Sequence, residues 1–404
     1  MSTPARTGPL RIAIPEFAAR GGLLHYSGQL AEALAGRGHD VYLLTPPSTE
    51  LAGHIERAHL VPCLAGSAAA VPRARGRLAR LAQRGARAGD LARAWWDVVR
   101  WLRANPVDVL MVGDLRLAID AAAFAAVSRL PRRPLLVDIC HNIQPVDTTG
   151  GGAAIDERFV TTRSLAAAYR RADVVVVHGR TNRRAFRDRW ATPASTIMIP
   201  HGDERLFGPP PDPVPGPPTA LFFGNWSSYK DLHLLLDAFA VVRRRLPEAR
   251  LEIVGHPTKD SDAEGIMRRA AAMGDAVGVR AEYVEIDEAR ACFARACVVA
   301  LPYRYGFQSG VTSVAFSLAR PVVCTRVGGL HEAVEASGGG RVVPSGDPSA
   351  FADALVEALA DPVASLARGR RAYEWQMSEA SWEAVAGLLE DGFRRALAEG
   401  GRAD

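Results

Sequence analysis

GPPPDPVPGPPTALFFGN, residues 208–225, joins a proline-rich segment directly to an apolar run. Seven of the eleven residues from 208 to 218 are proline. Because proline lacks an amide hydrogen and fixes its own φ angle, this segment can lie neither inside a helix nor in a central strand. The sequence therefore predicts a stiff linker over 208–218 and a new folding unit that begins at residue 219.

On both sides of this linker, short apolar runs alternate with helical patterns. Before it, the runs are LRIAIP (10–15), DVYLLTP (40–46), VDVLMVG (107–113), PLLVDIC (134–140) and ADVVVVHG (172–179). After it, they are TALFFGN (219–225), RLEIVGH (250–256), AEYVEI (281–286), CVVALPY (297–303), RPVVCT (320–325) and RVVPSG (341–346). Runs that are mostly apolar throughout are typical of parallel strands covered on both faces. The sequence predicts two doubly wound, Rossmann-like α/β domains facing each other across a cleft.

The same patterns divide the chain into four segments. They are an N-terminal Rossmann-like domain (1–207), the linker (208–218), a C-terminal Rossmann-like domain (219–374) and a helical tail (375–404). We expect the tail to pack back on the N-terminal domain. Ligands of such sheets bind beyond the carboxyl ends of the strands, so the expected site is the cleft between the two domains.

The composition limits the class of protein. Of the 404 residues, 48% are hydrophobic and 23% are charged, values that exclude disordered and fibrous chains. The five cysteines have no zinc-ligand spacing, which favours reduced thiols. No apolar stretch reaches 18 residues, and the first residues lack a signal-peptide core. We therefore expect a cytoplasmic protein.

The net charge of +5 is concentrated in one segment. Residues 73–103 hold nine arginines against two aspartates. Arg73, Arg77, Arg80, Arg84 and Arg87 form a stripe at helical spacing, and Trp95, Trp96 and Trp101 follow it. A basic amphipathic helix of this kind predicts peripheral contact with an anionic inner membrane face, or with a lipid-linked acceptor. The alternative is a solvated arginine face over a packed apolar face. One basic patch alone does not indicate nucleic-acid binding.

Lys230 is one of only two lysines among the 49 basic residues, a bias typical of a GC-rich genome. In FFGNWSSYKDLHLLLDAF (222–239) it stands between a predicted strand and an amphipathic helix. An ammonium beside a helix N-terminus favours an anionic group such as a diphosphate. The alternative is a solvated lysine.

Two further stretches place small residues between a strand and a helix. In Gln308-Ser309-Gly310-Val311, Ser309 suits a helix cap, and the following amides would then face an anion. Gly21-Gly22 follows the first strand and allows close approach of the backbone to a ligand. Taken singly, each of these is also explained by an ordinary cap or tight turn.

Seven stretches in this order resemble the retaining glycosyltransferases of family 4, which have the GT-B fold. They are GGLLHYSGQLAEALAGRGHDV (21–41), His141-Asn142, ADVVVVHGRTNRRAF (172–186), IPHGDERLF (199–207), GNWSSYKDLHLLLDAFA (224–240), PYRYGFQSGV (302–311) and RPVVCTRVGGLHEAV (320–334). The resemblance covers most of the chain, and it implies that the N-terminal domain (1–207) holds mainly the acceptor and the C-terminal domain (219–374) mainly the nucleotide sugar. It implies transfer of a sugar from a UDP- or GDP-linked donor to an acceptor hydroxyl, with retention of configuration.

The resemblance also implies roles for single residues. The donor-binding candidates are Gly21, Gly22, Ser227, Lys230, Gln308, Ser309, Gly310, Val311 and Glu332. The nucleobase is expected near residues 283–286. His141 is the catalytic candidate: the leaving diphosphate can accept the acceptor's proton, so His141 would orient groups or stabilise charge. A structural histidine in a turn is its alternative.

Three positions depart from the family pattern. Ser227 stands where members commonly carry an arginine, and Gly306 and Val314 stand where many carry glutamates. These losses leave Glu332 as the candidate carboxylate near the sugar. They also support the alternative of a degenerate, non-catalytic subunit that binds a partner or a membrane.

Asp260-Ser261-Asp262 has the form of the metal-binding DxD of a different glycosyltransferase fold. It comes several residues after a predicted strand, and we interpret it as a solvated acidic loop. We expect no metal and no cofactor apart from the nucleotide sugar as co-substrate. The acceptor stays open between a lipid-linked molecule and a small natural product, as do the base and the sugar.

Overall fold

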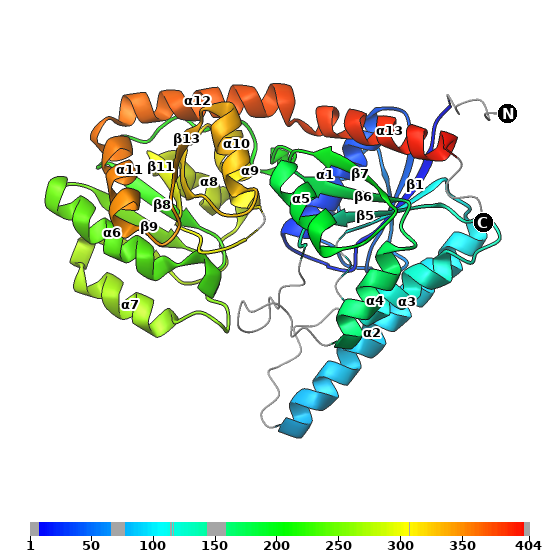
Figure 1. Ribbon diagram of the computed structural model, residues 1–404. Helices are drawn as coiled ribbons and strands as arrows, with labels where there is room; N and C mark the ends of the chain where they lie inside the picture. The colour runs from blue at the N-terminus through cyan, green and yellow to red at the C-terminus, as the bar shows by residue number, and fades with distance from the viewer. Residues whose placement is uncertain are drawn as a thin grey trace.

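The computed structural model describes residues 8–65, 77–113, 115, 117–143, 159–306 and 308–399 (Figure 1). Two parallel sheets form its two halves. The N-terminal sheet has seven strands in the order β3-β2-β1-β4-β5-β6-β7, and the C-terminal sheet has six in the order β10-β9-β8-β11-β12-β13. The prediction of two doubly wound α/β domains is confirmed.

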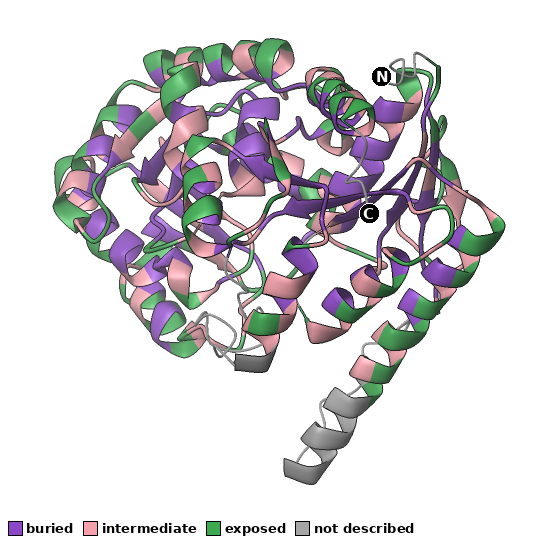
Figure 2. Cartoon of the chain, turned by 45° about the vertical axis from the view of Figure 1, so that its right-hand side comes forward, coloured by how far each residue is buried: buried purple, intermediate pink, exposed green. Residues whose placement is uncertain are grey.

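The N-terminal sheet is built from the apolar runs before the linker. Its strands are β1 (Arg11–Pro15), β2 (Asp40–Leu44), β3 (His59–Val61), β4 (Val109–Gly113), β5 (Leu135–Cys140), β6 (Val174–His178) and β7 (Ser195–Ile199). Its helices are α1 (Gly22–Gly36), α2 (Arg77–Ala104), α3 (Ala118–Val127), α4 (Phe159–Tyr169) and α5 (Arg180–Arg189). Strands β5 and β6 are buried along their whole length because helices cover both faces of the sheet; Figure 2 shows these strands in purple.

The C-terminal sheet repeats this plan. Its strands are β8 (Thr219–Phe223), β9 (Arg250–Val254), β10 (Val277–Arg280), β11 (Val298–Leu301), β12 (Val322–Thr325) and β13 (Gly340–Val343). Its helices are α6 (Leu232–Arg245), α7 (Ala263–Ala272), α8 (Ile286–Arg295), α9 (Gly310–Ser317), α10 (Leu330–Ser337) and α11 (Pro348–Ala360). Short 3-10 turns are η1 (Arg205–Phe207), η2 (Ser228–Lys230) and η3 (Gly274–Ala276).

One predicted strand is wrong, and two strands escaped prediction. Residues 281–286 do not form a strand; β10 lies just before them, where Val277 and Val279 pair with β9. Tyr283 is instead 60% exposed and leads into α8. Strands β3 and β7 occupy the two edges of the N-terminal sheet and carry fewer fully buried residues than its centre.

The chain ends in two long helices that connect the halves. Helix α12 (Pro362–Glu379) runs along the top of Figure 1, and α13 (Trp382–Ala398) continues beyond it over the N-terminal half. Helix α13 packs against α1, β5 and β7. Val385, Leu389 and Phe393 thereby join the N-terminal core. The C-terminal end of the chain thus closes the N-terminal domain.

Helix α2 projects away from the N-terminal sheet (Figures 1 and 2). Of the tryptophans singled out from the sequence, Trp95 is buried and donates a hydrogen bond to Asp120 at 2.9 Å. Trp101 is half-buried beside Tyr42, and only Trp96 is largely exposed, at 62%. The side chains of the stripe Arg73, Arg77, Arg80, Arg84 and Arg87 lie outside the described residues. Within the described ranges, no helix is long and apolar enough to cross a membrane.

Candidate functional site

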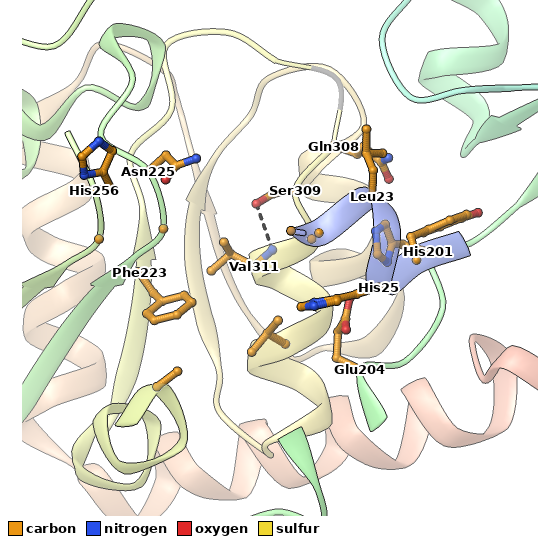
Figure 3. Close-up of a pocket in the computed structure, with 18 of the residues that line it drawn as sticks. Leu23, His25, His201, Glu204, Phe223, Asn225, His256, Gln308, Ser309 and Val311 are labelled. Atoms are coloured by element: carbon orange, nitrogen blue, oxygen red, sulfur yellow. Dashed lines mark hydrogen bonds between the residues drawn. The ribbon is translucent and has the colours of Figure 1, made fainter. Parts of the chain in front are cut away.

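A cavity of about 430 Å³ lies between the two halves, at the carboxyl ends of their strands (Figure 3). Its N-terminal wall is formed by the start of α1, the end of β5 and the segment after β7. Its C-terminal wall is formed by the loops after β8 and β9, the entrance to α8 and the start of α9. Parallel α/β sheets place ligands at this edge, so the cleft expected from the sequence exists.

Most of the sequence-predicted residues meet in this cavity. They are Gly21, Gly22, His141, Lys230, Gln308, Ser309, Gly310 and Val311. Residues Tyr283, Val284 and Ile286, expected near the nucleobase, line it too. The structure places two candidates elsewhere. Ser227 Oγ lies 3.4 Å from the Thr258 hydroxyl oxygen, and Glu332 lines a second cavity.

Lys230 closes the turn η2 and is only 7% exposed. Burial lowers the pKa of its ammonium to about 8. Its Nζ lies 5.4 Å from the centre of the Tyr303 ring. No carboxylate pairs with it among the residues that the structure describes. A buried, unpaired cation on a cavity wall is suited to bind an anion.

Of the two aspartates after β9, Asp260 contacts the turn that carries Lys230, and Asp262 caps a helix. Asp260 accepts hydrogen bonds from the Ser228 amide at 2.8 Å and from the Thr258 hydroxyl at 2.6 Å. Asp262 caps α7 through the Gly265 amide at 3.0 Å. Asp262 is exposed and Asp260 is half-buried, and both carboxylates also hold backbone amides in place.

The N-terminus of α9 lies close to Lys230. A Cβ atom on Gly224 would lie 3.0 Å from Lys230 Nζ and 3.4 Å from Val311 Cγ2. Ser309 is the cap, as expected, but its Oγ accepts a hydrogen bond from the Val311 amide at 3.3 Å. The Val311 amide is thus not free. The amide of Gly310 has no partner in the described ranges, so it is the one available to an anion.

Gly21 is the N-cap residue before α1 and has a φ of +99°, in the region that favours glycine. Its amide donates to Glu50 at 2.6 Å, and His25 contacts the same carboxylate oxygen at 2.6 Å. Glu50 therefore fixes the loop that Gly21-Gly22 forms over the cavity.

His141 lies at the end of β5, is 8% exposed and lines the cavity. The side-chain amide of Gln308 donates to its Nδ1 at 3.2 Å, a hydrogen bond between the two halves of the molecule. Because Nδ1 accepts, Nε2 carries the proton in this arrangement. This placement suits a group that donates to a ligand in the cavity.

Three functional candidates escaped sequence analysis: Tyr26, His201 and Glu204. The ring centre of Tyr26 lies 4.7 Å from that of His141 and 5.2 Å from that of His201. Glu204 accepts a hydrogen bond from Gln29 at 3.0 Å, and burial raises the pKa of its carboxyl to about 7. All three line the cavity. If β7 is recognised as a strand, His201 and Glu204 follow its carboxyl end. They then lie at the same end of the sheet as His141, which follows β5.

Glu332 connects the two halves at a different point. Its carboxylate accepts hydrogen bonds from the amides of Arg180 at 2.8 Å and Thr181 at 2.6 Å, at the start of α5. Partial burial alone would raise its pKa, but these amides hold the pKa below its usual value. Glu332 is therefore a cap across the domain interface in this structure.

Comparisons with known proteins agree with this architecture. The family model "Glycosyl transferase 4-like domain" matches residues 21–202, and "Glycosyl transferases group 1" matches residues 217–361. The D-inositol 3-phosphate glycosyltransferase of Streptomyces avermitilis is 30% identical over 234 residues, which are 56% of this chain and 48% of that protein. The chain spans about half the length of the first curated relatives that it matches.

Two solved structures share the fold over nearly the whole chain. Sucrose-phosphate synthase from Thermosynechococcus elongatus has a TM-score of 0.74 at 21% identity, with 97% of this chain and 100% of that chain covered. HepE of Anabaena, in complex with UDP-glucose, has a TM-score of 0.68 at 15% identity, with 96% and 100% covered. Together with the two family models on either side of the linker, this shows that the chain belongs to the group 1 glycosyltransferases, family 4, with the GT-B fold.

Proposed function

We propose that this chain transfers a sugar from a nucleoside diphosphate sugar to an acceptor hydroxyl, with retention of configuration. The observation that carries the proposal is the convergence of Lys230 and the start of α9 on Gly224. Nζ of Lys230 and the Val311 side chain both approach the Cβ position of this glycine, at 3.0 Å and 3.4 Å. A buried ammonium close to the start of a helix whose first amide, that of Gly310, has no partner in the described ranges suits a diphosphate.

The rest of the cavity supports the two ends of such a donor. Tyr283, Val284 and Ile286 would cover the nucleobase, and His141 would lie beside the sugar. In the transfer, the bond between the anomeric carbon and the diphosphate oxygen breaks. The acceptor oxygen forms its bond on the same face, and its proton passes to the leaving diphosphate. His141 would donate a hydrogen bond from Nε2 and so orient the sugar or stabilise developing charge.

The departures at Ser227, Gly306 and Val314 support the alternative, a non-catalytic subunit. Val314 lines the cavity where a carboxylate could otherwise face a ribose. The buried Lys230 argues against this alternative, because an unpaired buried cation destabilises a protein that never binds an anion.

Thermal unfolding with a nucleotide panel tests the proposal. UDP, GDP, ADP and their common sugars would be compared on the wild type, on Lys230→Ala and on Lys259→Ala. A ligand at 100 times its Kd stabilises by roughly 2.7 kcal/mol, a readily measured rise in Tm. We expect the Tm of the wild type to rise with the nucleotides of one base. This rise should be lost in Lys230→Ala and kept in Lys259→Ala, because Lys259, the other lysine of the chain, is exposed. No rise with any nucleotide would favour the non-catalytic subunit.

We also propose peripheral contact of α2 with an anionic membrane. Arg93, Trp96, Arg100 and Arg103 are exposed at helical spacing on the described part of α2. Basic side chains around an exposed tryptophan suit an anionic headgroup layer. We expect flotation of the protein with phosphatidylglycerol vesicles at low salt, reduced in Trp96→Ala. If the wild type does not float with the vesicles, the alternative holds, in which the basic face of α2 is only solvated.

A further inference from the structure

A second cavity, of about 510 Å³, lies on the opposite side of the start of α9. Its walls come from the ends of β6 and β7 in one half, from α9 and α10 in the other, and from α12 and α13. His201, Gln308 and Ser309 line both cavities. We propose that this second cavity holds the acceptor, and that the acceptor is a neutral, largely apolar molecule with one hydroxyl directed at His201. The inference rests on the proposed transfer function.

The walls of the second cavity are mainly apolar. The larger apolar surfaces of these walls come from Met198, Ile199, Leu330, Ala333, Trp375 and Leu388. Met198 and Leu388 are 38% and 43% exposed and are among the large apolar side chains that the structure leaves exposed. Trp375 is half-buried and packs edge-on against Phe316. A ligand that covers these side chains removes apolar surface from water at about 25 cal/mol for each Å².

The charges around this cavity disfavour an anion. Its described charged residues are Glu332, Glu379 and Arg180. The Glu332 carboxylate is already held by two amides at the start of α5, and Arg180 and Glu379 are exposed. The donor cavity differs, because Lys230 has no carboxylate partner among the described residues and the pKa of the carboxyl that lines it, Glu204, is raised by burial to about 7. A phosphorylated acceptor would meet repulsion here, whereas a neutral one would not.

His201 stands where the two cavities meet. Its Nδ1 lies 3.2 Å from the Gly202 carbonyl, which can only accept, so Nδ1 carries the proton and Nε2 is an acceptor. A Cβ atom on Gly310 would lie 3.7 Å from Nε2. Burial lowers the pKa of His201, which keeps the imidazole neutral. A hydroxyl that donates to Nε2 before the reaction would therefore lie beside the helix start that holds the diphosphate, and its proton would pass from this hydrogen bond to the leaving diphosphate as its oxygen attacks.

Fluorescence titration with 2-naphthol, a neutral aromatic alcohol, tests the site in the full chain saturated with UDP. Ala333→Trp places a large ring inside the cavity, and Glu335→Trp places the same ring on α10 away from it. We expect saturable binding of 2-naphthol that weakens roughly tenfold or more in Ala333→Trp and stays within about twofold in Glu335→Trp. Naphthalene-2-sulfonate, the anionic analogue, should bind more weakly than 2-naphthol.

The hydroxyl contact is tested by comparing 2-naphthol with naphthalene. We expect His201→Leu to lower the ratio of their affinities about three- to tenfold, the value of one hydrogen bond, and His201→Gln to restore part of it. A merely structural role of His201 would change both affinities equally and leave the ratio unchanged.

Several results would overturn the inference: no saturable binding of 2-naphthol, unchanged binding in Ala333→Trp, or stronger binding of the sulfonate. The Tm shift with UDP, measured on the same samples, separates this failure from failure of the proposed function. If UDP raises the Tm but 2-naphthol does not bind, the proposed acceptor site is rejected and the proposed transfer function is not. Absence of a shift in the wild type with every nucleotide of the panel removes the transfer function itself.

Discussion

At the scale of single residues, the charge of Lys230 governs the donor site. Burial lowers the pKa of its ammonium to about 8, while a bound diphosphate favours the charged form. The protonated fraction therefore falls from about 0.9 at pH 7 to about 0.1 at pH 9. We expect the Kd for UDP to rise about tenfold between these pH values, measured by calorimetry at constant ionic strength.

Lys230→Arg provides the control for this pH dependence. A guanidinium stays charged throughout the range, so the variant should bind UDP with an affinity that changes little from pH 7 to pH 9, even if it is weaker overall. A parallel rise of Kd in the wild type and in Lys230→Arg would show that another group titrates.

Some site residues can be predicted from neighbouring residues in the sequence, and others depend on distant parts of the fold. Lys230 and the stretch 308–311 could be predicted because strand, loop and helix follow one another directly in the sequence. His201 and Glu204 could not, because their place depends on β7, an edge strand with exposed Ser195 and Met198. Glu332 was expected near the sugar, but its role as a cap depends on how α10 meets α5, which no local pattern encodes.

At the scale of elements, the cap of Glu332 on α5 connects the two domains. Removing its charge in Glu332→Gln weakens two charge-assisted hydrogen bonds at a helix N-terminus. We expect a loss of about 1 kcal/mol, seen as a fall of about 2 °C in Tm at pH 7. Because the pKa of Glu332 is held below its usual value, this stabilisation is present at neutral pH and is lost as the pH falls through the lowered pKa.

Glu335→Gln on the same helix is the matched control. Glu335 pairs with Arg326 at the surface, where an ion pair contributes little, so its Tm should fall by less. Equal Tm values for the two variants at pH 7 would mean that the cap adds nothing to stability.

Element prediction succeeded for the central strands and failed at three of the four edge strands, β3, β7 and β10, whereas the edge strand β13 was predicted. The central strands β4, β5, β6, β8 and β9 coincide with the predicted apolar runs. The run at 281–286 was mistaken for a strand because Tyr283, Val284 and Ile286 are apolar or aromatic; here these residues line the cavity. Apolar side chains that serve a ligand site resemble strand residues in the sequence.

At the scale of the whole molecule, Glu204 lies where the two domains meet. Its carboxyl accepts a hydrogen bond from Gln29 of α1, and its amide donates to Ser317 of α9 at 2.8 Å. Burial raises the pKa of this carboxyl to about 7. Because the pKa of Glu204 is higher in the folded state than in the unfolded state, ionisation of Glu204 destabilises the fold. The protein is not destabilised below the ordinary pKa of about 4.5, and stability is lost as the pH rises from there through 7.

His178 and His201 act in the opposite direction, because burial lowers the pKa of both. Their neutral forms favour the folded state, so stability falls as the pH drops below the ordinary value of 6.5. Between pH 4.5 and 6.5, the histidines and Glu204 therefore oppose each other. When the Glu204 charge is removed, only the histidine contribution to the pH dependence of stability should remain.

Glu204→Gln keeps the size of the side chain and an acceptor for Gln29 while it removes the buried charge. We expect its Tm to exceed that of the wild type at pH 8, equivalent to about 2–3 kcal/mol, and to match it near pH 4.5. Across the range, the variant's Tm should rise up to about pH 6.5 and then level off, whereas that of the wild type should decline towards pH 8. Scanning calorimetry at half-unit steps of pH measures both curves. Parallel curves would show that Glu204 is already hydrated, and therefore that the two domains stand open around it in solution.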